Sequence, residues 1–100
     1  MLVIAGTVTI DPARREEAMT AAVVMMEETR REPGNLAYVF SGDFESEAVV
    51  HIFEHWESQE ALDAHFAAPH MAKFQKTLAG LGLQDMSVQK FQVSGVGPLF

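Results

Sequence analysis

The chain contains no cysteine among its 100 residues. Without a thiol it has no disulfide framework, no thiolate nucleophile and no thiolate metal ligand. Basic residues are also few, because 7 Lys and Arg stand against 14 Asp and Glu, for a formal net charge of −7. Nucleic acids and anionic membrane surfaces are bound through basic patches, so we expect neither as a partner.

Long hydrophobic runs are absent as well. The longest apolar stretch, Ala21 to Met26, is far too short to span a bilayer. The first ten residues lack the basic start of a secretory signal, and Asp11-Pro12 ends their apolar run. We therefore expect a cytoplasmic protein without a membrane partner.

Hydrophobic residues nevertheless make up 48% of the chain, which is high for one small domain. A chain of this length buries only a modest share of its surface by itself. We therefore expect part of the apolar surface to contact a second copy of the chain.

The hydrophobic pattern predicts one domain over residues 1–100 with the element order βαββαβ. Asp11 and Ser58 are good helix N-caps, and Pro33-Gly34 and Pro69 are expected to end or kink helices. The predicted strands are Leu2–Ile10, Leu36–Gly42, Ala48–Trp56 and Met86–Val93, and the predicted helices are Pro12–Arg31, a helix after Ser58, and a segment from Pro69 to about Gly80.

This order is typical of a ferredoxin-like α+β sandwich, in which an antiparallel sheet has both helical layers on one face. The other sheet face is then bare, and two such faces packed together would form a dimeric α/β-barrel. In the last strand the apolar alternation changes phase between Val88 and Phe91, which predicts a β-bulge. The tail from Ser94 ends in Leu99-Phe100. Two alternatives stay open for this tail, packing on a partner subunit and disorder.

Two segments carry a family resemblance. The segment Glu32-Pro33-Gly34-Asn35-Leu36-Ala37-Tyr38 looks like a Glu-Pro-Gly-x-x-x-Tyr turn, and Trp56 to His70 is similar to a pattern of Trp, Ala-Leu, His and Pro-His. Together they resemble the antibiotic biosynthesis monooxygenase family, in its quinol-monooxygenase-like branch. The resemblance implies a homodimer that oxygenates an aromatic phenol, quinol or anthrone with O2, without metal, flavin or haem.

The chain also departs from related patterns. The family often has Cys where this chain has Asn35, so a mechanism based on a thiol there is in doubt. A haem-degrading branch of the same fold uses an Asn, a Trp and a His. Thr7 and Gln75 fall near the Asn and His positions, so haem degradation is not expected.

Cofactor-free oxygenation requires a substrate that supplies electrons, a base that makes its anion, and an apolar cavity. We expect His65 to be the base, because a histidine titrates near neutral pH. The open alternative is a histidine held in the core by a backbone carbonyl. Trp56 is expected to orient the substrate through its indole N–H, or else to be the largest core residue.

Six further residues are expected to bind the substrate. Glu54 lies in an otherwise apolar strand, where it either pairs with a cation or accepts a second proton. The six are Tyr38, Phe53, Glu54, Phe66, His70 and Phe74.

No metal site is expected. His51 and His55 lie roughly 13 Å apart along one strand face, which is too far for one ion. His65 and His70 are separated by Pro69 and are poorly placed as a pair. Two other functions stay open, a cyclase, dehydratase or decarboxylase on the same fold and a non-catalytic dimeric binder of small aromatic ligands.

Overall fold

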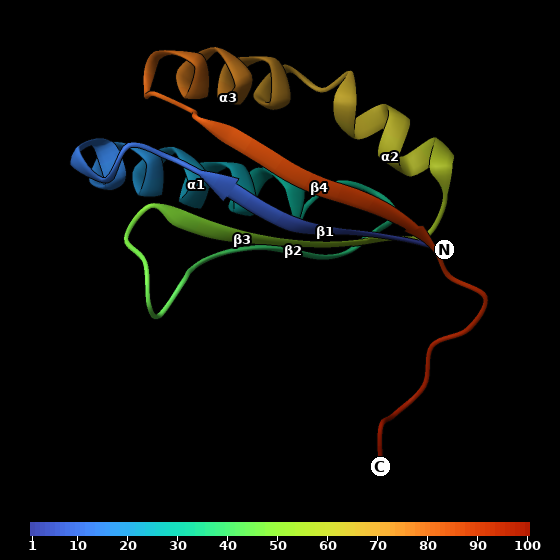
Figure 1. The fold of residues 1–100 in the computed structure, drawn as a ribbon. Coiled ribbons are helices and arrows are strands. Elements are labelled where there is room, and N and C mark those ends of the chain that lie inside the picture. The colour runs from blue at the N-terminus through green and yellow to red at the C-terminus, as the bar shows by residue number, and fades with distance from the viewer.

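The computed structural model describes residues 1–100 as a four-stranded antiparallel sheet with helices over one of its faces (Figure 1). The elements, in chain order, are β1 (Leu2–Thr9), the 3-10 turn η1 (Pro12–Arg14), α1 (Arg15–Thr29), β2 (Asn35–Gly42), β3 (Val49–Trp56), α2 (Gln59–Phe66), α3 (Pro69–Gly80) and β4 (Asp85–Gln92). The strand order is β2-β3-β1-β4, so the predicted ferredoxin-like α+β fold is confirmed. None of the helices is both long and apolar enough to cross a membrane.

Local chemistry sets the helix boundaries. The Asp11 side chain accepts the N–H of Ala13 at 3.0 Å and starts η1, from which α1 continues. Ser58 caps α2 by accepting the N–H of Ala61 at 3.2 Å. Ala68 is extended, as a residue before proline prefers, so α2 and α3 are separate helices on either side of it.

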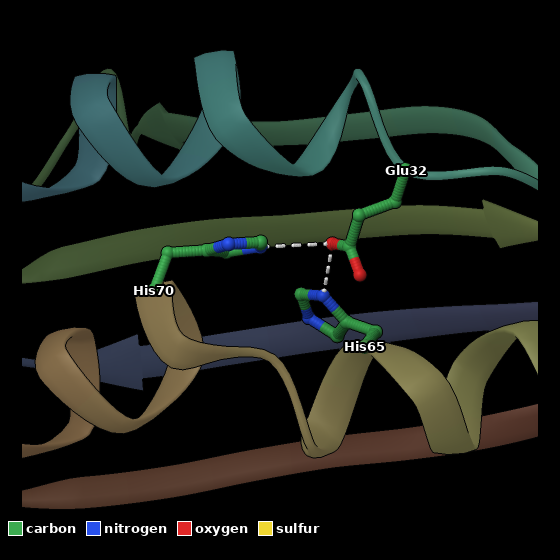
Figure 2. Close-up of side chains that lie close together, drawn as sticks. All are labelled: Glu32, His65 and His70. Atoms are coloured by element: carbon green, nitrogen blue, oxygen red, sulfur yellow. Dashed lines mark hydrogen bonds and ion pairs between the residues drawn. The ribbon is translucent and has the colours of Figure 1, made fainter.

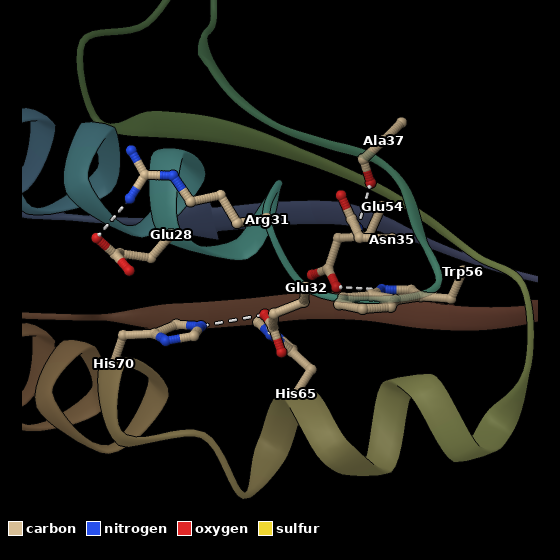
Figure 3. Close-up of polar contacts among 9 residues, drawn as sticks. All are labelled: Glu28, Arg31, Glu32, Asn35, Ala37, Glu54, Trp56, His65 and His70. Carbon is tan, nitrogen blue, oxygen red and sulfur yellow. Dashed lines mark hydrogen bonds and ion pairs between the residues drawn. The ribbon is translucent and has the colours of Figure 1, made fainter.

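One predicted detail of the sheet is wrong. The register of β4 on β1 runs without interruption from Leu2↔Gln92 to Thr9↔Asp85, so no bulge lies between Val88 and Phe91. Phe91 instead belongs to the sheet face opposite the helices. The irregularity lies in β2, between Asn35 and Ala37, where the Asn35 side-chain amide donates to the Ala37 carbonyl at 3.1 Å (Figure 3).

Strand alternation divides the sheet into two unlike faces. The helix-covered face carries the core, with one cluster around Leu2, Met25 and Trp56 and another around Val8 and Leu81. The opposite face carries half-exposed apolar side chains, among them Val39, Phe53 and Phe91. After Val93, the C-terminal tail runs away from the sheet, on the side opposite α2 and α3 (Figure 1).

Candidate functional site

A cavity of about 510 Å³ lies between the sheet and the helices, and 18 of its 23 lining residues are hydrophobic. The exposed side chains of Met19, Val23 and Met86 mark where it meets solvent. The volume falls in the range typical of small-molecule sites. Arg15, Ser41, Gly42, Glu54 and Gln75 are the lining residues that are not hydrophobic. Glu54 is thus the single carboxylic acid at the cavity, and no histidine lines it.

Glu54 reaches the cavity because it lies on the helix-facing side of β3, opposite Tyr38 of β2 and Ile4 of β1. It is 9% exposed, and its one side-chain hydrogen bond comes from the indole N–H of Trp56. Burial raises the pKa of Glu54 to about 7, and the charge of Glu32 adds to this rise, while the Trp56 bond opposes it. Glu54 therefore has a proton affinity suited to transfer near neutral pH.

Trp56 is completely buried and is not a lining residue of the cavity. Its Nε1–H donates to Glu54 Oε1 at 3.0 Å (Figure 3). Its ring lies 4.8 Å from that of His65 and 6.4 Å from that of Tyr38. The structure thus places Trp56 in the core, where its N–H holds Glu54 rather than pointing at the cavity.

His65 is also completely buried and lies outside the cavity lining. Its Nδ1 is 2.7 Å from Glu32 Oε2, and its Nε2 has no hydrogen-bond partner. Burial lowers the pKa of His65, and the adjacent Glu32 opposes that change. This geometry favours the core interpretation of His65, with a carboxylate in place of the expected backbone carbonyl.

His70 and His65 lie close together, contrary to the sequence-based expectation for this pair. His70 Nε2 is 3.1 Å from the same oxygen, Glu32 Oε2, and the two imidazole rings are 6.2 Å apart (Figure 2). The break at Pro69 places both on the side of Glu32. The sequence analysis did not include Glu32 among the site residues. Its position at the start of the Glu-Pro-Gly turn is the signal that could have indicated it.

The aromatic residues separate into two groups. Phe66 and Phe74 line the cavity, and Phe74 stacks on Phe40 at 5.7 Å. Tyr38 is a buried wall residue, and burial, followed by the charge of Glu54, raises the pKa of its hydroxyl. Phe53 lies on the opposite face of the sheet, so the structure does not bring it to the cavity.

The fold and the cavity define a small ferredoxin-like α+β domain that encloses a mainly apolar pocket with one carboxylic acid. The family model for antibiotic biosynthesis monooxygenases matches residues 1–77. This chain therefore belongs to the antibiotic biosynthesis monooxygenase family.

Solved structures and one curated protein are similar to this chain. A Deinococcus radiodurans protein provisionally named an antibiotic biosynthesis monooxygenase has a TM-score of 0.91 at 23% identity, over 100% of this chain and 99% of its own. A conserved Bacteroides thetaiotaomicron protein of unknown function has a TM-score of 0.82 at 27% identity, over 90% and 94%. An uncharacterised Synechocystis protein is 27% identical over 93% of this chain, which spans 63% of that relative's length.

Proposed function

We propose that this protein is a cofactor-independent monooxygenase that acts on a small aromatic phenol, quinol or anthrone. The observation that carries the proposal is the placement of Glu54, the single carboxylic acid of an otherwise mainly apolar cavity. Family membership and the names given to similar structures support the reaction class.

In the proposed reaction Glu54 removes a proton from the bound substrate. The electron-rich anion then transfers an electron to O2, a step that closed-shell neutral molecules undergo only slowly. For an anthrone, one oxygen atom replaces the two hydrogens of the CH2 group and the other leaves with them as water. The substrate supplies all the electrons, so the reaction balances without an added reductant.

The remaining residues have supporting roles in this proposal. Trp56 fixes the orientation of the Glu54 carboxylate through its hydrogen bond. Phe66, Phe74 and Tyr38 provide aromatic walls against which a substrate ring can pack. His65 and His70 position the Glu32 turn beside the core rather than touching the substrate, which moves the proposed base from His65 to Glu54.

The proposal includes a homodimer formed through the bare face of the sheet. Val39 and Phe53 are paired across β2 and β3, and Phe91 lies on the same face, where all three are 39–47% exposed. Leu99 and Phe100 of the tail are almost fully exposed as well. Burial of this surface against a second copy would remove it from water.

Oxygen uptake tests the function directly. Chelator-treated protein is mixed with a panel of hydroquinones, dihydroxynaphthalenes and anthrones, and uptake above autoxidation is compared for wild type, Glu54→Gln and Glu45→Gln. Glu45 is an exposed acid in the β2–β3 turn, so it controls for the loss of one carboxylate. Uptake that persists in Glu45→Gln and falls at least tenfold in Glu54→Gln supports the proposal.

The same experiment separates the other functions. Substrate consumed without oxygen would show a non-oxygenase enzyme on this fold. Compounds that raise the melting temperature without being consumed would show a binder. Either result replaces the monooxygenase proposal.

A further inference from the structure

Glu32, His65 and His70 form a cluster outside the cavity. Glu32 lies in the turn after α1, His65 in the last turn of α2 and His70 in the first turn of α3. Glu32 Oε2 is 2.7 Å from His65 Nδ1 and 3.1 Å from His70 Nε2, and the three atoms all lie within 4.8 Å of one another (Figure 2). Three groups that commonly bind metal ions therefore converge on one point.

The packing of the turn against α2 holds this geometry in place. Gly34 has φ +85°, and a Cβ there would lie 2.6 Å from Ala61 Cβ, so the turn contacts α2 directly. The Gly34 carbonyl also accepts the N–H of Glu57 at 2.9 Å. Glu32 is thus positioned by the backbone rather than by a flexible surface loop, as a preorganised ligand requires.

No arginine or lysine neutralises Glu32. The neighbouring Arg31 pairs with Glu28 at 3.5 Å (Figure 3), and Arg30 donates to the Tyr38 carbonyl at 3.1 Å. The carboxylate of Glu32 is 13% exposed, and its side-chain partners are the two imidazoles. A partly buried anion without a permanent counter-ion is an environment that favours a bound cation.

The orphaned nitrogen of His65 is a second observation. If Nδ1–H donates to Glu32, then Nε2 keeps a buried lone pair without a partner. The His65 ring packs against the aromatic rings of Tyr38 and Trp56, 5.3 and 4.8 Å away. A metal ion on Nδ1 would leave the proton on Nε2, and an N–H group interacts better with aromatic rings than a lone pair does.

We propose that Glu32, His65 and His70 bind a divalent transition-metal ion, with Zn²⁺ as the best match to two imidazoles and a carboxylate. Tetrahedral zinc with metal–ligand distances near 2.0–2.1 Å separates its ligand atoms by roughly 3.3 Å. The two oxygen–nitrogen distances, 2.7 and 3.1 Å, need only small increases to reach that value. The two histidine nitrogens lie within 4.8 Å of each other and would move to the same separation. Water would occupy the fourth position, on the side of the partly exposed His70.

The ion would connect the end of α1 to α2 and α3. None of its three ligands lines the apolar cavity, so the ion is expected to be structural. It would act on Glu54 only by offsetting the charge of Glu32. The metal site goes beyond the proposed function. The metal-site proposal and the monooxygenase proposal can each fail without the other.

Calorimetric titration with ZnCl2 of untagged, chelator-stripped protein tests the site. We expect one ion per chain, and at least a tenfold loss of affinity in both Glu32→Gln and His70→Ala. The matched control is His51→Ala, because His51 and Asp43 form an exposed pair at 2.8 Å that could hold zinc weakly. The control is expected to bind zinc as the wild type does.

His65 is completely buried, so its substitution would disturb the core and is not used as a test. Two further readouts complete the test. Zn²⁺ should raise the melting temperature of the wild type and of His51→Ala, but not of His70→Ala. Co²⁺ should give the strong visible absorption of a four-coordinate site. Absence of binding, or binding lost in His51→Ala and kept in folded Glu32→Gln and His70→Ala, would overturn the proposal.

Discussion

Glu54 is held in a position where its charged form is unfavourable. It is nearly buried, its partner Trp56 is a neutral donor, and the nearby Glu32 has the same charge. These conditions raise the pKa of Glu54 to about 7, compared with about 4.3 for an unfolded glutamate. With this pKa, Glu54 is partly ionised near neutral pH, and its carboxylate can accept a proton from a phenol, which is the property that the proposed function requires.

The raised pKa also has a consequence for stability. The folded state binds this proton more tightly than the unfolded state, so Glu54 stabilises the fold fully below about pH 4 and loses that contribution as the pH rises through about 7. Glu54→Gln removes the titration. The free energy of unfolding of the variant relative to wild type should therefore increase by roughly 2–3 kcal/mol between about pH 5 and about pH 8. Urea denaturation at both values measures it, and parallel pH profiles would contradict the assignment.

Trp56 combines two roles that substitutions can separate. Trp56→Ala leaves a large cavity and should lower the free energy of unfolding by about 3–5 kcal/mol. Trp56→Phe keeps most of the apolar volume and removes only the hydrogen bond to Glu54, so we expect less than half that loss. Denaturant titration of both variants checks this, and equal losses would show that the hydrogen bond dominates.

The sequence predicted some of these residue positions but not their partners. Period-2 alternation placed Glu54 and Trp56 on one strand face, and the structure agrees. The alternation could not show that the indole N–H of Trp56 donates to Glu54. It also could not show that Glu32 lies beside His65, which is 33 residues away in the chain. Such contacts depend on how the turn after α1 packs on α2, and strand or helix periodicity carries no information about that packing.

Among the elements, the turn between α1 and β2 has the most demanding backbone. Gly34→Ala would put a Cβ against Ala61 at positive φ, so we expect a loss of about 1–3 kcal/mol in the free energy of unfolding. Gly80→Ala is the matched control, because nothing lies within 4 Å of its added Cβ. Thermal and urea unfolding compare them, and similar effects for the two variants would mean that the turn tolerates a side chain.

Element boundaries were predictable where a local signal exists. Asp11, Ser58 and Pro69 begin or separate helices as expected, because capping and the proline ring act over a few residues. The predicted bulge in β4 is wrong because the change of phase between Val88 and Phe91 has another cause. Phe91 contributes to an apolar patch on the sheet face opposite the helices. An apolar residue on a bare face disturbs the alternation just as a bulge would.

The whole molecule has an apolar sheet face that nothing in a single chain covers. If two copies pack through it, light scattering should give a mass near twice 11.0 kDa. Phe53→Lys places a charge in the centre of this face and should produce monomers. Val24→Lys, at a similarly exposed apolar position on α1, should leave the dimer intact. A monomeric wild type, or dissociation by Val24→Lys alone, would contradict this arrangement.

The overall fold was predictable because the order of strands and helices, together with the two motif segments, leaves few topologies for 100 residues. The cavity was predictable only in its character. Its aromatic walls follow from the strand and helix patterns. That Glu54 is the titratable group of the cavity, and His65 is not, depends on tertiary packing, which buries His65 outside the cavity lining.

The pH dependence of oxygen uptake tests the central claim most directly. With an accepted substrate, we predict that kcat/KM of the wild type rises with pH through a pKa near 7. In Glu54→Gln this limb should vanish and the rate should fall toward the autoxidation background. An identical profile in wild type and Glu54→Gln would show that Glu54 is not the base.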